Sequence, residues 1–556
     1  MGHRKKATLI VIMFISIVIL SLNTDASPKK TYPLFSFFAV SSPITILNDS
    51  NFTDYGFPGS GTSSDPVLIE DLNITSNDEI GIYVTNTSKH FIIQNCYIQN
   101  TSYGIYVNTT KSGTPTILNN ICFNNFQRSI HIVDTYNSSI INNTCSFSKK
   151  YSIHVRNGTG CMIKSNYCHS NSWVGIFVDK SNSSYIQDNV CTENLSGGIV
   201  LDYCSFSLVS NNTCNYNNFH GGIRLLQCYS SEVLNNTCHY NSQYNLDIRS
   251  SNSSTVSGNE CKGNSYGMLV DSGGQVSILS NKVIDCANGI WVRDAEYSII
   301  KENILTDCSI SINEESAEEL LTYTLCSNYI NGKLFGFITE QRRITISDSH
   351  YGQLMLVRCS KIKIKNQELS STTIGIELVE CNEISISNSF FKNNRDMGIL
   401  LRNSEGIEVI NNSFEFNGNY GIKLESSSFN SITYNSFTEN TRWGVVLDSN
   451  SDGNEIHHNS FIRNNLFYGT SQVKDDGKEN IWYDTSTQQG NYYDDYLGKG
   501  NYSIDGLANA CDFYPLAEPP IYSPPNYFGY FAFLSLLILI PVCVFAIKKV
   551  RKKRRL

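Results

Sequence analysis

The chain has 556 residues, a formal net charge of −8 and only 17% charged residues. A nucleic-acid partner needs basic side chains spread over the body of the protein, and this sequence has no such region, so this class of partner is excluded. Asn, Ser, Ile and Tyr dominate the middle of the chain, a composition that favours strands and turns over helices.

Residues 1–26 have the pattern of a secretion signal. MGHRKK carries positive charge, ATLIVIMFISIVILSL is apolar, and Ala26 stands where cleavage is expected. The sequence leaves a cleaved signal peptide and an uncleaved signal anchor both open. Residues 27–66 then predict a linker and an N-terminal cap for the part that follows.

A short motif, Gly or Ser followed by apolar, any and apolar residues, recurs along the body of the chain. It runs from GIYV at Gly81 to GVVL at Gly444 in steps of 22 to 25 residues. Across a weaker stretch, Ser309, Gly332 and Gly352 keep the phase, which predicts one uninterrupted array. The apolar residues alternate at period two, which indicates strands, and so short a unit must stack on its neighbours. We therefore predict an all-β, right-handed parallel β-helix of about 17 coils over residues 67–468.

A second motif lies about nine residues before each of these. It places an Asn at a fixed phase from Asn95 to Asn303 and from Asn366 to Asn459, where the amide can bond its equivalents in the adjacent coils. The Cys two residues later alternates with an exposed Thr, so we predict that it points inward and fills the core. In later coils this position becomes Val or Leu and then Phe, at 390, 414, 437 and 461, which a metal ligand or nucleophile would not tolerate. The predicted core cysteines are Cys122, Cys145, Cys168, Cys191, Cys214, Cys238 and Cys261.

Two outward columns lie side by side on the predicted sheet, two and four positions after each Gly or Ser. Asp179 and Asp202 fall in adjacent coils, roughly 5 Å apart, so one carboxyl could serve as a general base or the pair could hold Ca²⁺. With His154 for proton transfer, these aspartates are the candidate catalytic residues. The candidate ligand-binding residues, expected to neutralise a sugar carboxylate or stack on sugar rings, are Tyr83, Tyr106, Arg156, Arg224, Asp247 and Trp291.

The C-terminal part of the chain changes character. Residues 469–520 predict a closing segment, and 521–526 a Pro-rich linker. Tyr527–Ile547 has no charge and as a helix would reach about 31 Å, which predicts a transmembrane helix at 527–547. The basic residues 548–556 predict a cytoplasmic tail, so the β-helix is expected outside the cell on one span, or on two if the N-terminal segment is retained. Many N-x-S/T sequons in the body of the chain fit this location and predict a glycoprotein.

The motifs GI-x-V and NN-x-C resemble those of NosD-like proteins and of the wider carbohydrate-binding and sugar-hydrolase (CASH) group of parallel β-helices. Asn51–Ile74 is similar to the segment that precedes the first coil in archaeal cell-surface β-helix proteins, and Asn480–Gly500 with Cys511–Leu516 to their closing segment. The NosD resemblance implies copper and nitrous-oxide reductase maturation. The ten His and six Met form no cluster of soft ligands on an exposed column, so the residues predict no metal site and no cofactor besides the Ca²⁺ candidate.

Two classes of function follow from these patterns. The favoured one is a non-catalytic surface module that binds extracellular glycans or cell-envelope components, because a rod anchored at one end presents its sides to neighbours. The alternative is a polysaccharide lyase, epimerase or hydrolase acting on uronides at the exposed face. The same face is also consistent with a solvated surface held by ordinary ion pairs between strands, such as Arg156 with Asp179.

Overall fold

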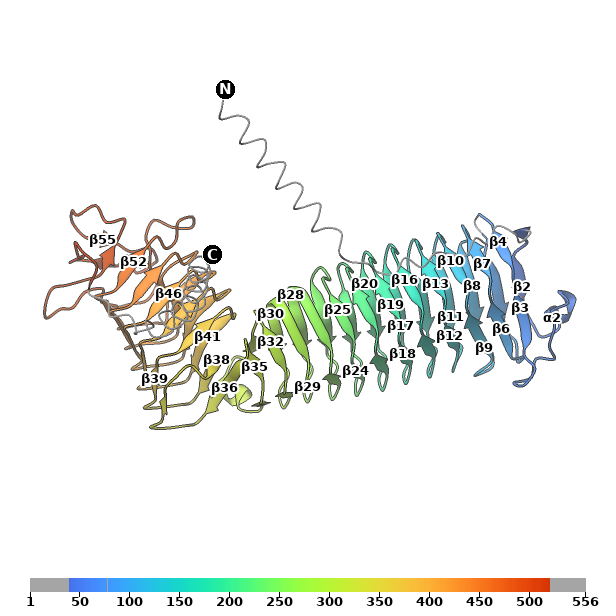
Figure 1. The fold of residues 1–556 in the computed structure, drawn as a ribbon, viewed down its shortest axis with the longest axis horizontal. Coiled ribbons are helices and arrows are strands. Elements are labelled where there is room, and N and C mark those ends of the chain that lie inside the picture. Colours follow the sequence, from blue (N-terminus) through green and yellow to red (C-terminus); the bar gives the residue numbers. More distant parts are fainter. Residues whose placement is uncertain (1–39, 78, 521–556) are drawn as a thin grey trace, which may run out of the picture.

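The computed structural model describes residues 40–77 and 79–520, which form an elongated parallel β-helix (Figure 1). The predicted signal segment, transmembrane helix and basic tail lie outside the described residues. Within the described part, no helix is both long and apolar enough to cross a membrane. Its two helices are short, α2 (Asn51–Asp54) and α3 (Ala317–Leu320).

Each regular coil consists of three strands joined by tight corners. One coil contains β9 (Pro115–Leu118), β10 (Ile121–Phe123) and β11 (Arg128–Val133). Their parallel partners in the next coil are β12 (Ser139–Ile141), β13 (Thr144–Ser146) and β14 (Ile153–Arg156). Because the pairing is in register, a side chain at a given phase lies above its equivalent in the next coil.

The tetrapeptide NNTC, which occurs three times in the sequence, forms one corner of the coil. Asn142 has a φ of 54°, in the left-handed region that Asn tolerates better than most residues. Asn143 and Cys145 are then buried, and Thr144 between them is half-buried on the outer side. The motif therefore combines a turn residue with two inward-pointing side chains.

The inward asparagines form a continuous ladder of hydrogen bonds. Asn143 donates from Nδ2 to Oδ1 of Asn166 at 3.0 Å and to the carbonyl of Ile117 at 2.9 Å. Its own Oδ1 accepts from the backbone N and the Nδ2 of Asn120, both at 3.0 Å. Equivalent bonds continue to Asn328, and a second ladder runs from Asn412 to Asn491, which confirms the predicted stacking of amides.

The predicted core column is also confirmed. The cysteines at 122, 145, 168, 191, 214, 238 and 261 have no exposed surface, and no cysteine of the described residues forms a disulfide. Later in the chain, Phe414 stacks on Phe437 with ring centroids 4.8 Å apart, and Phe437 on Phe461 at 4.9 Å.

Some predicted positions are wrong by one residue. Phe391 rather than Phe390 is the buried member of the phenylalanine column. Likewise the ladder position expected at Asn95, Asn366 and Asn388 belongs to the following residue. The backbone N–H groups of Cys96, Gln367 and Ser389 donate to the ladder side chain of the next coil. In each case the Asn itself has a positive φ and forms the turn. The position of the corner is therefore predicted correctly, but the residue that points inward is the next one.

The prediction of one uninterrupted array is wrong. Between β33 (Ile310–Asn313) and β38 (Tyr351–Val357), the chain forms α3, β34 (Thr324–Cys326) and an antiparallel hairpin of β35 (Tyr329–Ile330) with β36 (Lys333–Thr339). The hairpin turns at Asn331 and Gly332, whose φ values of 51° and 78° suit a tight two-residue turn. Gly332 is thus a turn residue and does not carry the phase of the repeat.

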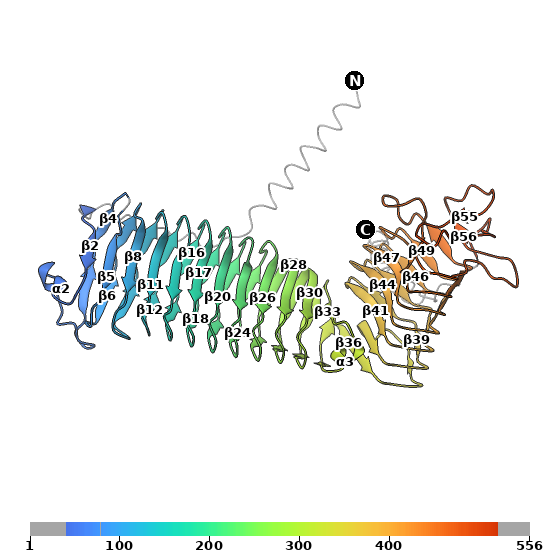
Figure 2. The ribbon, with the colours of Figure 1, turned by 180° about the vertical axis from the view of Figure 1, so that it is seen from behind.

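The hairpin divides the β-helix into two segments that meet at a bend (Figures 1 and 2). We name residues 40–330 the first segment and residues 333–520 the second segment; each has its own core cluster over most of its length. At the bend, the Gln353 side chain replaces a backbone ladder: Nε2 donates to the Ile310 carbonyl at 2.9 Å, and Oε1 accepts from its N at 3.2 Å. Thr373 and Arg395 of the second segment also bond to the end of the first.

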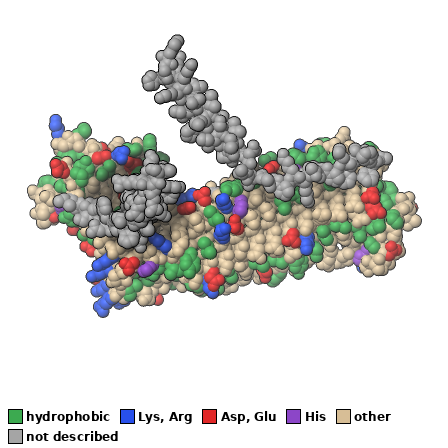
Figure 3. All heavy atoms as spheres, viewed as in Figure 1, with side chains coloured by type: hydrophobic (Ala, Val, Ile, Leu, Met, Phe, Trp, Pro, Cys, Tyr) green, Lys and Arg blue, Asp and Glu red, His purple; other side chains and the backbone are tan. Residues whose placement is uncertain are grey.

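Side chains close both ends of the described structure. At the start, the ring of Phe52 in α2 packs 5.8 Å from Phe91. At the end, Tyr493 continues the phenylalanine column at 5.3 Å from Phe461, and Tyr502 stacks on Tyr493. Between these ends, charged side chains are scattered over the face drawn in Figure 3 and do not dominate it.

Candidate functional site

The candidate site lies on the outer face of the strands that carry the Gly or Ser motif. These strands pair in parallel and in register, so the sequence positions of the two outward columns become neighbours in space. In chain order they are β5 (Ile82–Thr85), β8 (Tyr103–Asn108), β11, β14, β17 (Val174–Asp179), β20 (Gly197–Asp202), β23 (Gly221–Leu226), β26 (Tyr244–Arg249), β28 (Glu260–Asp271) and β30 (Lys282–Arg293).

Five consecutive coils carry an aromatic ladder, formed by Tyr83, Tyr106, His131, His154 and Phe177. Consecutive rings stack with centroids 4.8 to 5.2 Å apart. Tyr106 is covered on both faces by its neighbours, so it has no open face for a sugar ring. The predicted tyrosine platform is therefore a packed column whose rings contact one another.

The two histidines of the ladder are buried, with His131 8% and His154 4% exposed, and their ring nitrogens have no hydrogen-bond partner. Burial lowers the pKa of His131 to about 3 and that of His154 to about 2. Both rings are therefore neutral at neutral pH and pack as aromatic groups. His154 does not line the cavity described next, and the proton-transfer role predicted for it is not retained.

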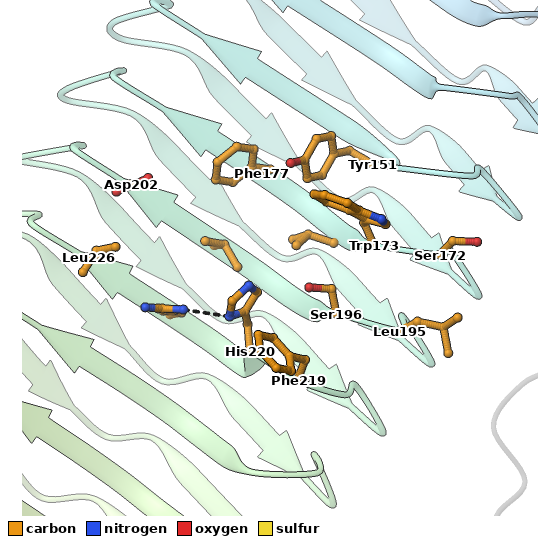
Figure 4. A pocket seen from close by; sticks show the side chains of 13 residues that line it. Tyr151, Ser172, Trp173, Phe177, Leu195, Ser196, Asp202, Phe219, His220 and Leu226 are labelled. Atoms are coloured by element: carbon orange, nitrogen blue, oxygen red, sulfur yellow. Dashed lines mark hydrogen bonds between the residues drawn. The ribbon is translucent and has the colours of Figure 1, made fainter.

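The ladder ends in a hollow because Phe177 is followed in its column by Val200. In the neighbouring column, Val174 pairs with Gly197, so this part of the face carries small side chains. The hollow has a volume of about 590 Å³. Tyr151, Trp173 and Phe177 lie on one side of it, and Phe219 and His220 on the other (Figure 4). Arg224, which is bonded to His220, also lines it.

The two predicted carboxylates meet at the edge of this hollow. Asp202 lines it, and Asp179 stands beside Asp202 in the adjacent strand. Burial and, second, the charge of Asp179 raise the pKa of Asp202, although Arg224 and Lys180 act against this. Asp179 is paired with Arg156, whose Nε lies 3.4 Å from Oδ2. The structure thus brings Asp179, Asp202 and Arg156 into one row, as the phase predicts.

Arg224 is held from two sides. Its Nη1 donates to Nδ1 of His220 at 2.7 Å, so His220 carries its proton on Nε2, because a guanidinium can only donate. Burial and the charges of Arg224 and Arg249 lower the pKa of His220 to about 4, which keeps this ring neutral. On the other side, Nε of Arg224 lies 3.4 Å from Asp247 Oδ2, and Asp247 Oδ1 accepts from Arg249 Nε at 2.7 Å. Asp247 is only 1% exposed, so it positions Arg224 and is not itself a ligand contact.

Most of the aromatic walls were missed by the sequence analysis. The missed residues come from the corner before the strand, whereas the two predicted columns lie on the strand itself, after Gly or Ser. They are Tyr151, Trp173, Phe219 and His220. The signal in the sequence is an aromatic or His residue one to three positions before the motifs at Ser152, Gly175 and Gly222. Trp291, predicted as part of the same face, lies four coils beyond Val200 at the bend and is not part of the hollow.

This geometry defines a class of protein: a parallel β-helix whose outer face carries a charged hollow with aromatic walls. The sequence matches the family described as periplasmic copper-binding protein (NosD) over residues 41–221, 201–334 and 329–502. The chain belongs to the NosD family. No curated protein matches the sequence.

Several solved structures share the general architecture. The mannuronan C-5 epimerase AlgE6 A-module of Azotobacter vinelandii is 11% identical, with a TM-score of 0.26 over 64% of this chain and 98% of that one. PfbA, a surface adhesin of Streptococcus pneumoniae, is 12% identical, with a TM-score of 0.28 over 70% and 93%. A mutant of the PL6 family alginate lyase AlyGC is 9% identical, with a TM-score of 0.32 over 86% and 100%. At this level of likeness none of them carries an argument about activity.

The family description names copper, and the cysteines of the core column do not fit such a site. A thiol must lose its proton to bind a metal, but burial raises the pKa of Cys168 and Cys191 in the core column well above the ordinary value. Residues 40–77 and 79–520 contain no group of three or more His, Cys, Asp or Glu that could hold a metal ion. Ca²⁺ fits no better, because it takes about 6–8 oxygens and the Asp179–Asp202 pair is partly occupied by Arg156.

Proposed function

We propose that the protein is a membrane-anchored, extracellular β-helix that binds acidic glycans in the hollow without transforming them. Trp173 and Phe219, 49% and 67% exposed, stand on opposite walls. Binding sites are typically concave and lined by aromatic side chains around a few placed polar groups. The open aromatic pair on either side of Arg224 is the observation that carries the proposal.

Arg224 supports an acidic sugar as the ligand. It is fixed by His220 and by Asp247 before any ligand arrives, so little side-chain entropy is lost when it meets a carboxylate. Asp247 is shared with Arg249, so one positive charge of this group is left for a ligand. A guanidinium also suits a planar carboxylate better than an ammonium does. Asp202, which has the raised pKa, can accept a hydrogen bond from a sugar hydroxyl when it is ionised and donate one when it is protonated.

The binding test uses the full-length chain in detergent micelles, with oligogalacturonate and alginate oligosaccharides as probes. We expect at least one of these acidic probes to bind, and Trp173→Ala to weaken that binding at least 10-fold. Phe206→Ala is the matched control, because Phe206 is an exposed aromatic at a different corner and does not line the hollow. If neither probe binds, or if Trp173→Ala leaves the affinity unchanged, the proposal is wrong.

A second candidate function rests on Asp202. A carboxyl of raised pKa in the same hollow as Arg224 and His220 has the composition of an acid–base site for a uronide lyase or epimerase. The same probes decide between the candidates, because a lyase creates an unsaturated sugar that absorbs ultraviolet light and an epimerase changes the sugar's NMR signals. Product that forms with the native chain and disappears with Asp202→Asn would replace the binding proposal by the enzymatic one.

A further inference from the structure

The bend between the two segments contains a second cavity, of about 310 Å³, which we name the elbow notch. The first segment lines it from β28, β30 and β33, and the second from β41 (Ile374–Val379), β44 (Met397–Arg402) and β47 (Tyr420–Glu425). It does not overlap the hollow. By strand spacing Trp291 lies about 19 Å from Val200 along the same face.

The wall from the first segment is aromatic. Trp291 stacks on Tyr266 with ring centroids 5.1 Å apart and planes inclined by 21°. The guanidinium of Arg293 lies 5.4 Å from the centre of the Trp291 ring and helps to fix the indole in place. After Trp291 the column continues with Ser311, a small residue, so the indole borders open space at the bend.

The wall from the second segment is charged, and its charges are paired. Glu377 is 7% exposed and accepts from Arg402 Nη1 at 3.2 Å. Lys423 Nζ lies 2.5 Å from Oε1 of Glu425, whose Oε2 is 4.0 Å from Arg402 Nε. Glu377 and Glu425 are thus paired with the two basic groups, while Asp396, the third acidic residue of the lining, accepts from Asn419 Nδ2 at 2.7 Å. The remaining donors and acceptors of these side chains border the notch.

The second wall has one carboxylate more than its basic groups, which disfavours an acidic ligand. An aromatic platform opposite such a set of donors and acceptors suits a ligand with hydroxyl groups and no net charge. A charged ligand would have to compete with ion pairs that are already formed, whereas hydroxyl groups can bond the free positions of the same side chains. An apolar ligand would leave these buried polar groups without partners.

We propose that the elbow notch binds a neutral sugar ring, which stacks on Trp291 and is hydrogen-bonded by Glu377, Arg402 and Lys423. This inference goes beyond the function proposed for the hollow and does not depend on it, since the two sites share no residue and take sugars of different charge. Because both segments contribute, a bound sugar also joins the two arms of the bend.

The test uses the full-length chain with cellohexaose, chitohexaose and maltohexaose as neutral probes. We expect at least one probe to bind, Trp291→Ala to weaken it at least 10-fold, and Ser311→Trp to block it by filling the notch without removing the platform. Tyr297→Ala is the matched control, because Tyr297 is an exposed aromatic of the following corner that does not line the notch.

Tryptophan fluorescence separates the two sites. In Trp173→Phe the response to a neutral probe is expected to persist, and in Trp291→Phe it is expected to disappear while the response to an acidic probe remains. If none of the neutral probes binds, or if binding survives both Trp291→Ala and Ser311→Trp, the inference is overturned. A loss of acidic-probe binding in Trp173→Ala concerns only the hollow, so failure of one proposal is distinguishable from failure of the other.

Discussion

The two segments build the same coil around different cores. In the first segment the inward column is cysteine from Cys122 to Cys261, whereas in the second the equivalent column is phenylalanine from Phe391 to Phe461. In both, an asparagine ladder runs beside the column with amide bonds close to 3.0 Å. The ladder is therefore the feature that the coils share, and the filler varies.

The glycine of the repeated motif allows its strand to lie close to the core filler in both segments. A Cβ added to Gly198 in the first segment would lie 3.0 Å from Cβ of Cys214, and one added to Gly421 in the second would lie 2.5 Å from the ring of Phe437. The strand approaches the filler closely in both segments. A larger filler is thus accommodated elsewhere in the coil, and not by withdrawing this strand.

The largest difference between the segments is expected when the filler is removed. Phe414→Ala deletes a ring that stacks on Phe391 and Phe437, and such a change typically lowers the free energy of unfolding by about 3–5 kcal/mol. Cys191→Ala deletes one buried atom and should cost about 1 kcal/mol. Denaturant unfolding followed by circular dichroism measures both. Equal losses in the two variants would mean that the cores do not differ in the way described.

Breaking the ladder should, by contrast, affect both segments alike. Asn189→Ala and Asn435→Ala each leave a buried backbone carbonyl and the groups of the adjacent asparagines without partners. A buried polar group without a hydrogen-bond partner costs about 1–3 kcal/mol, so we expect the free energy of unfolding of each variant to fall by about 2–4 kcal/mol. The measurement is the same unfolding experiment, with Asn182→Ala on the outer surface of a corner as control. A loss confined to one segment would show that the ladder is not the shared element.

How much of the fold and of the two cavities could be predicted depends on how local the sequence pattern is. The period of the motif and the alternation around Cys145 predict coils, inward thiols and amide ladders, because each coil repeats the same local geometry. The hairpin at Gly332 was misread because a glycine in a turn and a glycine in a strand look alike at the expected phase. The hollow was half predicted: Asp202 and Arg224 follow from the columns. Trp173, by contrast, projects from a corner, and the elbow notch joins residues about a hundred positions apart.

The segments should also differ in their response to acid. His131 and His154 in the first segment have lowered pKa values, so they stay neutral in the folded chain while the unfolded chain takes up protons near pH 6.5. Stability is therefore full above this pH and is lost as the pH falls. Between pH 7 and pH 6 the two rings together should cost about 1.4 kcal/mol.

Replacing these rings by phenylalanine tests the assignment. His131→Phe with His154→Phe extends the stack of Phe177 and should remove most of the acid sensitivity of the first segment. Asp512 in the second segment should change stability with pH in the opposite direction. Burial raises the pKa of its carboxyl to about 6, so protonation as the pH falls through that value removes the cost of burying its charge. Hydrogen exchange read by mass spectrometry reports the segments separately. If the first segment keeps its acid sensitivity in the double variant, its source lies outside the ladder.

The smallest effect on stability is expected at the bend itself. Arg395 of the second segment donates from Nη2 to Oδ1 of Asp285 at 2.9 Å and to the carbonyl of Asp307 at 3.2 Å. An exposed ion pair contributes about 0–1 kcal/mol, so Arg395→Ala should hardly change unfolding. The pair does, however, join two arms that share few other bonds, so small-angle X-ray scattering should show a wider spread of maximum dimensions. Lys392→Ala removes an ion pair within the second segment, to Glu415, and should leave the scattering unchanged. Equal scattering from both variants would mean that Arg395 does not set the angle, which the other contacts across the bend, such as those of Gln353 and Thr373, would then maintain.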